Sequence, residues 1–194
     1  MKKNKIKGFE IVAILSAIGI IGWLITDFYG GMIINLFSFG ILIIPFIILY
    51  LISIIETIIS IGRKGVKSNK IKLFAHGIVI ISIISLNVYH SELFKSKAVL
   101  SAVLKDDLFH YRLVFRENGT VENHINGFMG FSETIYGKYT FEKDLIVFSK
   151  KPYDNNFIPD TLLLDKKQNA IFITKNKKGM FETEKVWLNY FEIE

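Results

Sequence analysis

The chain contains no cysteine among its 194 residues, which excludes disulfides, thiolate zinc sites and cysteine nucleophiles. It also lacks the HExxH, GxSxG, P-loop and dinucleotide-binding motifs of common enzyme classes. His110 and His124 lie on separate predicted strands, without the spacing of metal ligands. We therefore expect a protein that is not an enzyme and that needs neither a metal nor another cofactor.

Acidic residues are scarce in the first half of the chain. Residues 1–90 contain three acids and nine lysines or arginines, whereas residues 91–194 contain fifteen of each sign. The net charge of +6 therefore belongs to the first half, where basic residues flank apolar segments as membrane-anchoring lysines do. The nearly neutral second half does not suggest a DNA or RNA polymer as partner. We divide the chain into a membrane domain, 1–90, and a soluble domain, 91–194.

Three apolar segments, 9–26, 32–61 and 73–89, are candidates for membrane-spanning helices. The middle segment is too long for one perpendicular helix and short for two. Because Pro45 lies near its centre, we predict one tilted or kinked helix. A tight helical hairpin turning at residues 40–45 is the alternative. Glu56 is expected to extend towards the interface, and His76 to make a polar contact between helices.

The charge distribution predicts the topology. The basic N-terminus and the basic loop 62–72 should both face the cytoplasm. Three spans of the inner (cytoplasmic) membrane then place the soluble domain outside the cytoplasm. A hairpin in the middle segment would instead place that domain in the cytoplasm.

Alternating apolar and polar residues replace the helical pattern after Ser91. Phe109, Tyr111, Leu113 and Phe115 alternate with polar or smaller residues, which indicates a strand with one buried face. Similar runs occur at 98–104, 121–125, 135–141, 145–149, 161–164, 171–175 and 186–193. About eight short strands with turns between them predict an all-β sandwich or a small antiparallel, lipocalin-like barrel. Side chains would fill such a barrel, or it would hold one small ligand.

The connection 150–160 holds two of the three prolines in the chain. A long, stiffened loop at a barrel mouth could serve as a lid or bind a partner. The alternative is an Ω-loop that packs Phe157 and Ile158 under the barrel.

A ligand site could be assembled from cations and aromatic residues of the soluble domain. Arginine offers planar donors to phosphate, and tyrosine offers a stacking face to a base. The candidate ligand-binding residues are Arg112, Arg116, Lys138, Tyr139, Lys151 and Tyr153. The alternative places Arg112 and Arg116 on a solvated exterior, because the neighbouring apolar residues form the better core face.

Membrane spans followed by a β-barrel of about a hundred residues resemble the membrane effectors of CBASS-type and Panoptes-type anti-phage systems. The resemblance covers the whole chain as architecture, and not as a residue-level motif. It implies an antiviral defence effector whose barrel binds a cyclic nucleotide, with homo-oligomerisation and membrane disruption as the response. Gly19, Gly22, Gly30 and Gly31 offer small surfaces for helix contact. The chain departs from that pattern, since such effectors typically have two spans and a cytoplasmic barrel.

Two other hypotheses belong to different classes. The first is a membrane-anchored binding or immunity protein, whose extracytoplasmic barrel captures a protein partner. The second is a structural subunit of an envelope complex.

Overall fold

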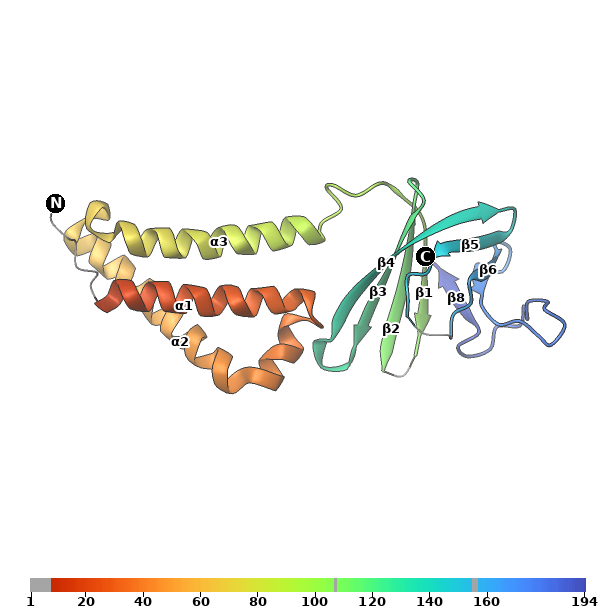
Figure 1. Cartoon of the computed structure of the whole chain (residues 1–194), viewed down its shortest axis with the longest axis horizontal. Coiled ribbons are helices and arrows are strands. Elements are labelled where there is room, and N and C mark those ends of the chain that lie inside the picture. The colour runs from red at the N-terminus through yellow and green to blue at the C-terminus, as the bar shows by residue number, and fades with distance from the viewer. Residues whose placement is uncertain (1–7, 107, 155–156) are drawn as a thin grey trace. The chain divides into compact units, whose positions relative to one another are not determined.

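The computed structural model describes residues 8–106, 108–154 and 157–194, so the basic N-terminal residues lie outside the described part. The chain forms two compact units, which meet in sequence between Phe94 and Lys95. The first unit is helical and the second consists of strands and loops (Figure 1).

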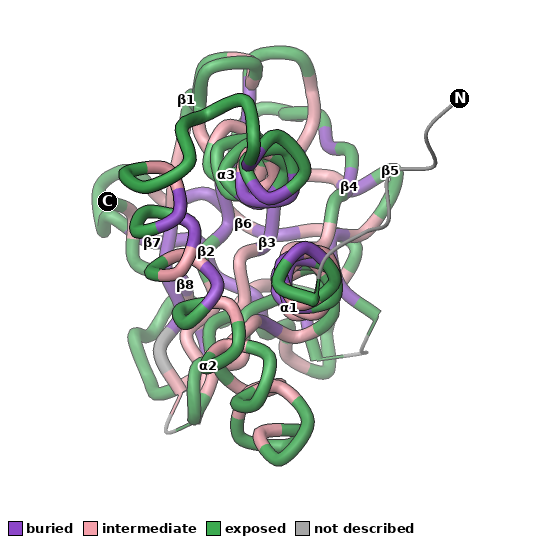
Figure 2. Tube along the Cα trace, turned by 90° about the vertical axis from the view of Figure 1, so that its left-hand side faces the viewer, coloured by how far each residue is buried: buried purple, intermediate pink, exposed green. Residues whose placement is uncertain are grey.

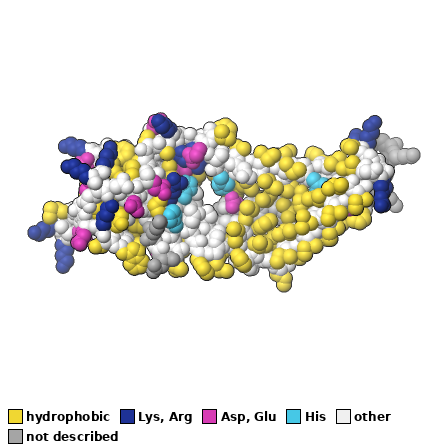
Figure 3. Space-filling model, turned by 180° about the vertical axis from the view of Figure 1, so that it is seen from behind, with side chains coloured by type: hydrophobic (Ala, Val, Ile, Leu, Met, Phe, Trp, Pro, Cys, Tyr) yellow, Lys and Arg dark blue, Asp and Glu magenta, His cyan; other side chains and the backbone are white. Residues whose placement is uncertain are grey.

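In the described residues, three helices are long and apolar enough to cross a membrane, as predicted. They are α1 (Gly8–Ile25), α2 (Met32–Lys64) and α3 (Lys70–His90). The short 3-10 turns η1 (Thr26–Phe28) and η2 (Val66–Asn69) connect them. Apolar side chains dominate the face of the helical unit drawn in Figure 3, whereas charged side chains gather on the strand unit. Such an apolar surface fits contact with lipid.

The middle segment is one kinked helix and not a hairpin. Its backbone leaves helical geometry at Phe39, with φ −123° and ψ 22°. The bend therefore lies before Pro45, at a point where Gly40 weakens the helix. The remainder, 40–64, is about 37 Å long at 1.5 Å per residue, enough to cross a hydrocarbon core of about 30 Å.

The helices α1 and α3 run in the same direction and pack side by side. At one end, His90 Nε2 lies 2.7 Å from Asp27 Oδ2, and the rings of Phe28 and Tyr89 are 5.2 Å apart. Figure 2 shows buried residues along one side of each helix. Gly8 and His90 consequently lie at opposite ends of the helical unit.

The described strands of the second unit form a closed antiparallel barrel of eight strands, as the sequence predicted; they do not form a sandwich. Each strand pairs with the next along the chain, and β1 closes on β8 through Ala102↔Ile193 and Val103↔Glu192. The strands are β1 (Ala98–Lys105), β2 (Phe109–Arg116), β3 (Thr120–Gly127), β4 (Ser132–Glu142), β5 (Leu145–Lys150), β6 (Thr161–Asp165), β7 (Ala170–Phe172) and β8 (Tyr190–Ile193).

Apolar side chains fill the barrel interior. Leu113, Phe115, Val121, Ile146 and Phe191 belong to one continuous core and are fully buried. Of the two predicted interiors, the structure therefore has the one packed with side chains. Any ligand of this barrel must bind at its surface or at an end.

The connection 150–160 packs as an Ω-loop; residues 155–156 lie outside the described part. Tyr153 and Ile158 are core residues, and Asn123 Nδ2 donates to the Pro152 carbonyl oxygen over 3.1 Å. Phe157, which was expected to pack with Ile158, is half exposed.

The last strand is shorter than the predicted run 186–193 and begins at Tyr190. Leu188 adopts a left-handed backbone, with φ 62°, which is incompatible with an extended strand. Residues 173–189 instead form a long loop between β7 and β8. Residues 185–188 of this loop line the pocket described next.

Candidate functional site: a surface pocket on the barrel

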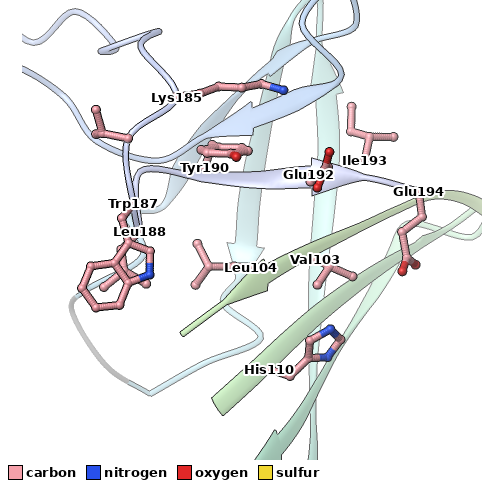
Figure 4. A pocket seen from close by; sticks show the side chains of 11 residues that line it. Val103, Leu104, His110, Lys185, Trp187, Leu188, Tyr190, Glu192, Ile193 and Glu194 are labelled. Atoms are coloured by element: carbon pink, nitrogen blue, oxygen red, sulfur yellow. The ribbon is translucent and has the colours of Figure 1, made fainter. Parts of the chain in front are cut away.

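A pocket of about 420 Å³ lies where β1 meets β8, between residues that face outward and residues at the edge of the core (Figure 4). Strands β1, β2 and β8 contribute to its lining, and the loop 173–189 covers one side. The lining residues are Val103, Leu104, His110, Lys185, Val186, Trp187, Leu188, Tyr190, Glu192, Ile193 and Glu194.

Side chains that alternate between the two faces of β1 and β8 form one side of the pocket. Ala102 and Leu104 point into the core, so Val103 between them faces outward. Val103 pairs with Arg112 on β2 and with Glu192 on β8. The same rule turns Tyr190, Glu192 and Glu194 outward beside the buried Phe191. Rigid strands therefore fix one half of the pocket.

Asn189 holds the loop half of the pocket in place. Its buried side chain accepts a hydrogen bond from the Thr174 backbone N–H over 3.2 Å. It also donates to the carbonyl oxygens of Glu182, at 3.0 Å, and Glu184, at 2.9 Å. Three backbone groups thus depend on one amide, which positions the segment 185–188.

Two aromatic rings border the pocket. Trp187 is 66% exposed, which is unusual for so large an apolar side chain. Lys185 Nζ lies 5.1 Å from the centre of the Tyr190 ring, a cation–π contact. An exposed indole beside a cavity is a ready stacking surface for a flat ligand.

The charges around the pocket are of both signs. Arg112 Nε lies 2.8 Å from Glu194 Oε2, and both side chains are about half exposed. Glu192 is exposed, and His110 lines the opposite wall (Figure 4). The arrangement can stack an aromatic group and bind polar groups of either charge around it.

Arg116 lies elsewhere, in a buried ion cluster. Only 2% of Arg116 is exposed, so the solvated position considered from the sequence is wrong. Its Nε donates to Glu122 Oε1 over 2.7 Å and its Nη2 to Oε2 over 3.0 Å. Its Nη1 donates to the Ser96 carbonyl oxygen over 2.6 Å. This guanidinium acts as a structural anchor between β2, β3 and the segment before β1.

Glu122 is the centre of that cluster. Lys95 Nζ lies 2.9 Å from its carboxylate and His124 Nε2 lies 3.0 Å from it. Burial would raise the pKa of Glu122, but the hydrogen bonds and charges of Arg116 and Lys95 outweigh burial and lower it. Burial lowers the pKa of His124, against the opposing effect of Glu122. A neutral His124 fits these contacts, with Nε2–H donating to Glu122 and Nδ1 accepting from the Thr134 hydroxyl at 3.0 Å.

The two candidate tyrosines belong to the core. Tyr139 donates its hydroxyl hydrogen to the Arg116 carbonyl oxygen over 3.0 Å, and Tyr153 donates to that of Pro159. Burial raises the pKa of both phenols, and Asp160 adds to the effect on Tyr153. Neither ring offers a free face for stacking at the barrel surface, because both belong to the continuous core.

The two candidate lysines occupy separate surfaces. Lys151 forms an ion pair with Asp160, and its Nζ lies 5.9 Å from the centre of the Tyr153 ring. Lys138 is exposed at the irregular pairing of β4 with β5, beside Lys150.

No family model, curated protein or solved structure matches this chain.

The structure thus joins some candidate residues in pairs but does not gather all six. Arg116 contacts Tyr139, and Lys151 contacts Tyr153. Of the six candidates, only Arg112 is connected with the 420 Å³ pocket, because it forms an ion pair with the lining residue Glu194. Trp187 and Tyr190 were not predicted as site residues, because the run 186–193 has the composition of an ordinary strand. The one available signal was a tryptophan close to the charged residues that precede this run.

Proposed function

We propose that the chain is a membrane-anchored sensor and effector, whose barrel binds a small ligand and whose helices respond within the membrane. The observation that supports this best is the exposed Trp187 at a 420 Å³ pocket on a folded barrel. A volume of this size lies within the range of about 300–1,000 Å³ typical of ligand pockets. The same chain supplies three apolar helices in its described part.

A cyclic oligonucleotide is the ligand class that we propose. Trp187 and Tyr190 supply faces for base stacking, and Lys185 and His110 can approach phosphate oxygens. Arg112 could join them, because a half-exposed pair such as Arg112–Glu194 contributes at most about 1 kcal/mol and exchanges readily. Ligand-driven homo-oligomerisation and membrane disruption in antiviral defence would be the output.

Fluorescence offers a direct test, because Trp187 is the only tryptophan in residues 95–194. The fragment 95–194 is titrated with cyclic di- and trinucleotides while the emission of Trp187 and the melting temperature are recorded. We expect one compound to quench the emission and raise the melting temperature.

The control variants are Trp187→Ala and Phe128→Ala, which both remove an exposed aromatic side chain. Measured by the melting temperature, because this variant has no tryptophan emission, Trp187→Ala should weaken binding about tenfold or more, since stacking contributes about 1–3 kcal/mol per base. Phe128→Ala, outside the pocket, should leave binding unchanged. Absence of any response at millimolar concentration would contradict a nucleotide ligand.

Capture of a protein partner outside the cytoplasm is a second candidate function. Two observations favour it. The parallel α1 and α3 carry Gly8 and His90 to opposite ends of the helical unit, and basic residues precede Gly8 in the sequence and recur in the loop 62–72. The carboxylates of Glu192 and Glu194 also favour a positively charged partner.

Reporter fusions at the C-terminus distinguish the two locations. Under the extracytoplasmic arrangement, alkaline phosphatase fused after Glu194 is active and green fluorescent protein exported by the general secretory route is dark. The reverse pair of results would place the barrel in the cytoplasm, where a cytoplasmic nucleotide can reach it.

A further inference from the structure

One side of α2 is turned inward and packs within the helical unit. Ser53, Thr57 and Ser60 lie at the i, i+4, i+7 spacing of one helix face, and all three are buried. His76 Nε2 of α3 lies 3.2 Å from Thr57 Oγ1, so the polar contact between helices expected at His76 is confirmed. This face of α2 therefore serves the packing of the helices.

A second side of α2 is open and forms a groove with the first turn of α1. The groove has a volume of about 380 Å³. Its apolar lining consists of Phe9 of α1 with Ile52, Ile55 and Ile59 of α2, and each of these side chains is about half exposed. Lipid tails are as apolar as these side chains, so an acyl chain can fill the groove.

The isoleucine stripe of the groove ends in two cations. Arg63 and Lys64 also line the groove, and Arg63 continues the spacing of the isoleucines, eleven residues after Ile52. Both cations are exposed, and neither forms an ion pair with a residue in the described part of the chain. Figure 3 shows basic side chains at this end of the helical unit. From Ile52 to Arg63 the helix rises about 17 Å, close to one leaflet of a hydrocarbon core of about 30 Å.

The groove also contains a carboxylate, that of Glu56, which Lys72 of α3 neutralises. Lys72 Nζ lies 2.6 Å from Glu56 Oε2, and only 5% of the Lys72 side chain is exposed. Glu56, which was expected to extend towards the interface, thus pairs with another helix. The charge that the groove presents to a ligand is consequently that of Arg63 and Lys64.

We propose that this groove is a binding site for an anionic phospholipid. The headgroup phosphate binds at Arg63 and Lys64, and one acyl chain lies along the apolar lining. The planar guanidinium suits a phosphate, and basic pockets between membrane helices bind anionic headgroups. The site does not depend on which ligand or partner the barrel binds.

A second copy of the chain suits the groove less well. Residues 62–72 contain five lysines or arginines and no acid. In a membrane, a second copy of the same orientation would bring these cations to the depth of Arg63 and Lys64. Like charges would then face each other, whereas an anionic lipid supplies the opposite charge at that depth.

The test measures lipid binding to the full chain in detergent by native mass spectrometry. The probes are palmitoyl-oleoyl phosphatidylglycerol and palmitoyl-oleoyl phosphatidylcholine, which have the same acyl chains and differ in net headgroup charge. We expect phosphatidylglycerol to bind at least about tenfold more tightly, because each nearby cation strengthens binding of an anionic lipid roughly fivefold. Excess inorganic phosphate should not displace it. Equal binding of the two lipids, or displacement by phosphate, would overturn the site.

Paired charge variants distinguish the groove from general attraction to the basic loop. Arg63→Gln combined with Lys64→Gln should reduce the preference for phosphatidylglycerol at least about tenfold. Lys67→Gln combined with Lys70→Gln removes the same charge from exposed loop positions outside the groove lining. We expect this control to change the preference less than about threefold, because salt screens more distant charges. Equal reductions in both double variants would overturn the site.

A pair of tryptophan variants tests the acyl-chain part of the groove. Ile55→Trp fills the groove and should weaken phosphatidylglycerol binding at least about tenfold, since apolar contacts with the chain are lost. Ile58→Trp changes an equally exposed isoleucine outside the lining and should leave binding unchanged. Melting temperatures without added lipid verify that both variants fold. Unchanged lipid binding in Ile55→Trp together with fewer cross-linked oligomers would assign the groove to a second copy and overturn the lipid site.

Discussion

Arg116 and Glu122 form a two-point ion pair across neighbouring strands, with both side chains almost wholly buried. Burying such a pair costs desolvation free energy for both charges, and the pair is stable only when its remaining hydrogen-bonding groups are satisfied. Ser96, Lys95 and His124 supply those partners here. The pair therefore fixes the segment that precedes β1 onto β2 and β3.

Removing Arg116 should destabilise the barrel strongly. Arg116→Met leaves the Glu122 carboxylate buried without its main partner, and we expect a loss of about 3–5 kcal/mol in the free energy of unfolding. Arg112→Met, on the same strand, breaks only the half-exposed pair with Glu194 and should cost less than about 1 kcal/mol. Urea unfolding of residues 95–194 measures both. Equal losses would show that Arg116 is no more important to folding than a surface arginine.

Acid should destabilise the barrel in two stages. Folding lowers the pKa of His124, so its contribution is complete above the ordinary value of 6.5 and is lost as the pH falls towards the folded value. Folding also lowers the pKa of Glu122, so its contribution is complete above 4.5 and is lost at lower pH. Unfolding free energies measured from pH 8 to 3 should show both declines.

Two variants assign these stages to their residues. His124→Gln should flatten the first decline, and Glu122→Gln the second. A first decline that persists in His124→Gln would mean that another group causes it.

Local patterns in the sequence predicted the strands and helices, because burial of one face imposes a period that a single segment reveals. The buried state of Arg116 could not be predicted in this way. Its partner Glu122 comes from the next strand, and register alone brings the two together. The bend at Phe39 was likewise missed, because the proline six residues later is the stronger local signal.

The pocket could not be predicted from the sequence for a different reason. The segment 186–189 has strand-like composition, but Leu188 adopts a left-handed backbone and breaks the strand. Long-range hydrogen bonds of Asn189 stabilise that conformation. No local rule assigns a leucine to such a turn.

Asn189 should be required for the shape of the pocket. Asn189→Leu removes three hydrogen bonds to the loop backbone and leaves those groups partly buried. We expect the loop to loosen while the barrel stays folded. Hydrogen exchange of residues 173–189 should accelerate at least about tenfold, with little change in β2 and β3. Lys177→Leu, at an exposed position of the same loop, is the control. Uniform acceleration throughout the barrel would contradict this local role.

Gly137 should not tolerate a side chain. A Cβ at this position would lie 2.8 Å from the Pro152 backbone nitrogen and closer still to the Lys150 carbonyl oxygen. Because both obstacles are backbone, Gly137→Ala must displace the Ω-loop, and we expect a loss of about 1–3 kcal/mol. Gly127→Ala meets the Phe109 ring, which can rotate away, and should cost less. Urea unfolding compares them, and a larger loss for Gly127→Ala would contradict the proposed contact.

Gly19 and Gly22 should respond differently to leucine. A Cβ on Gly19 would lie 2.7 Å from Phe46 Cβ, so this glycine already serves the contact between α1 and α2 within one chain. Nothing lies within 4 Å of a Cβ on Gly22, which leaves that surface open to a second copy. Gly19→Leu should lower the melting temperature of the detergent-solubilised chain, whereas Gly22→Leu should leave it unchanged. Chemical cross-linking in membranes should show fewer oligomers for Gly22→Leu. Unaltered cross-linking would show that Gly22 is not part of a contact between copies. An unaltered melting temperature for Gly19→Leu would contradict the close packing of α1 on α2.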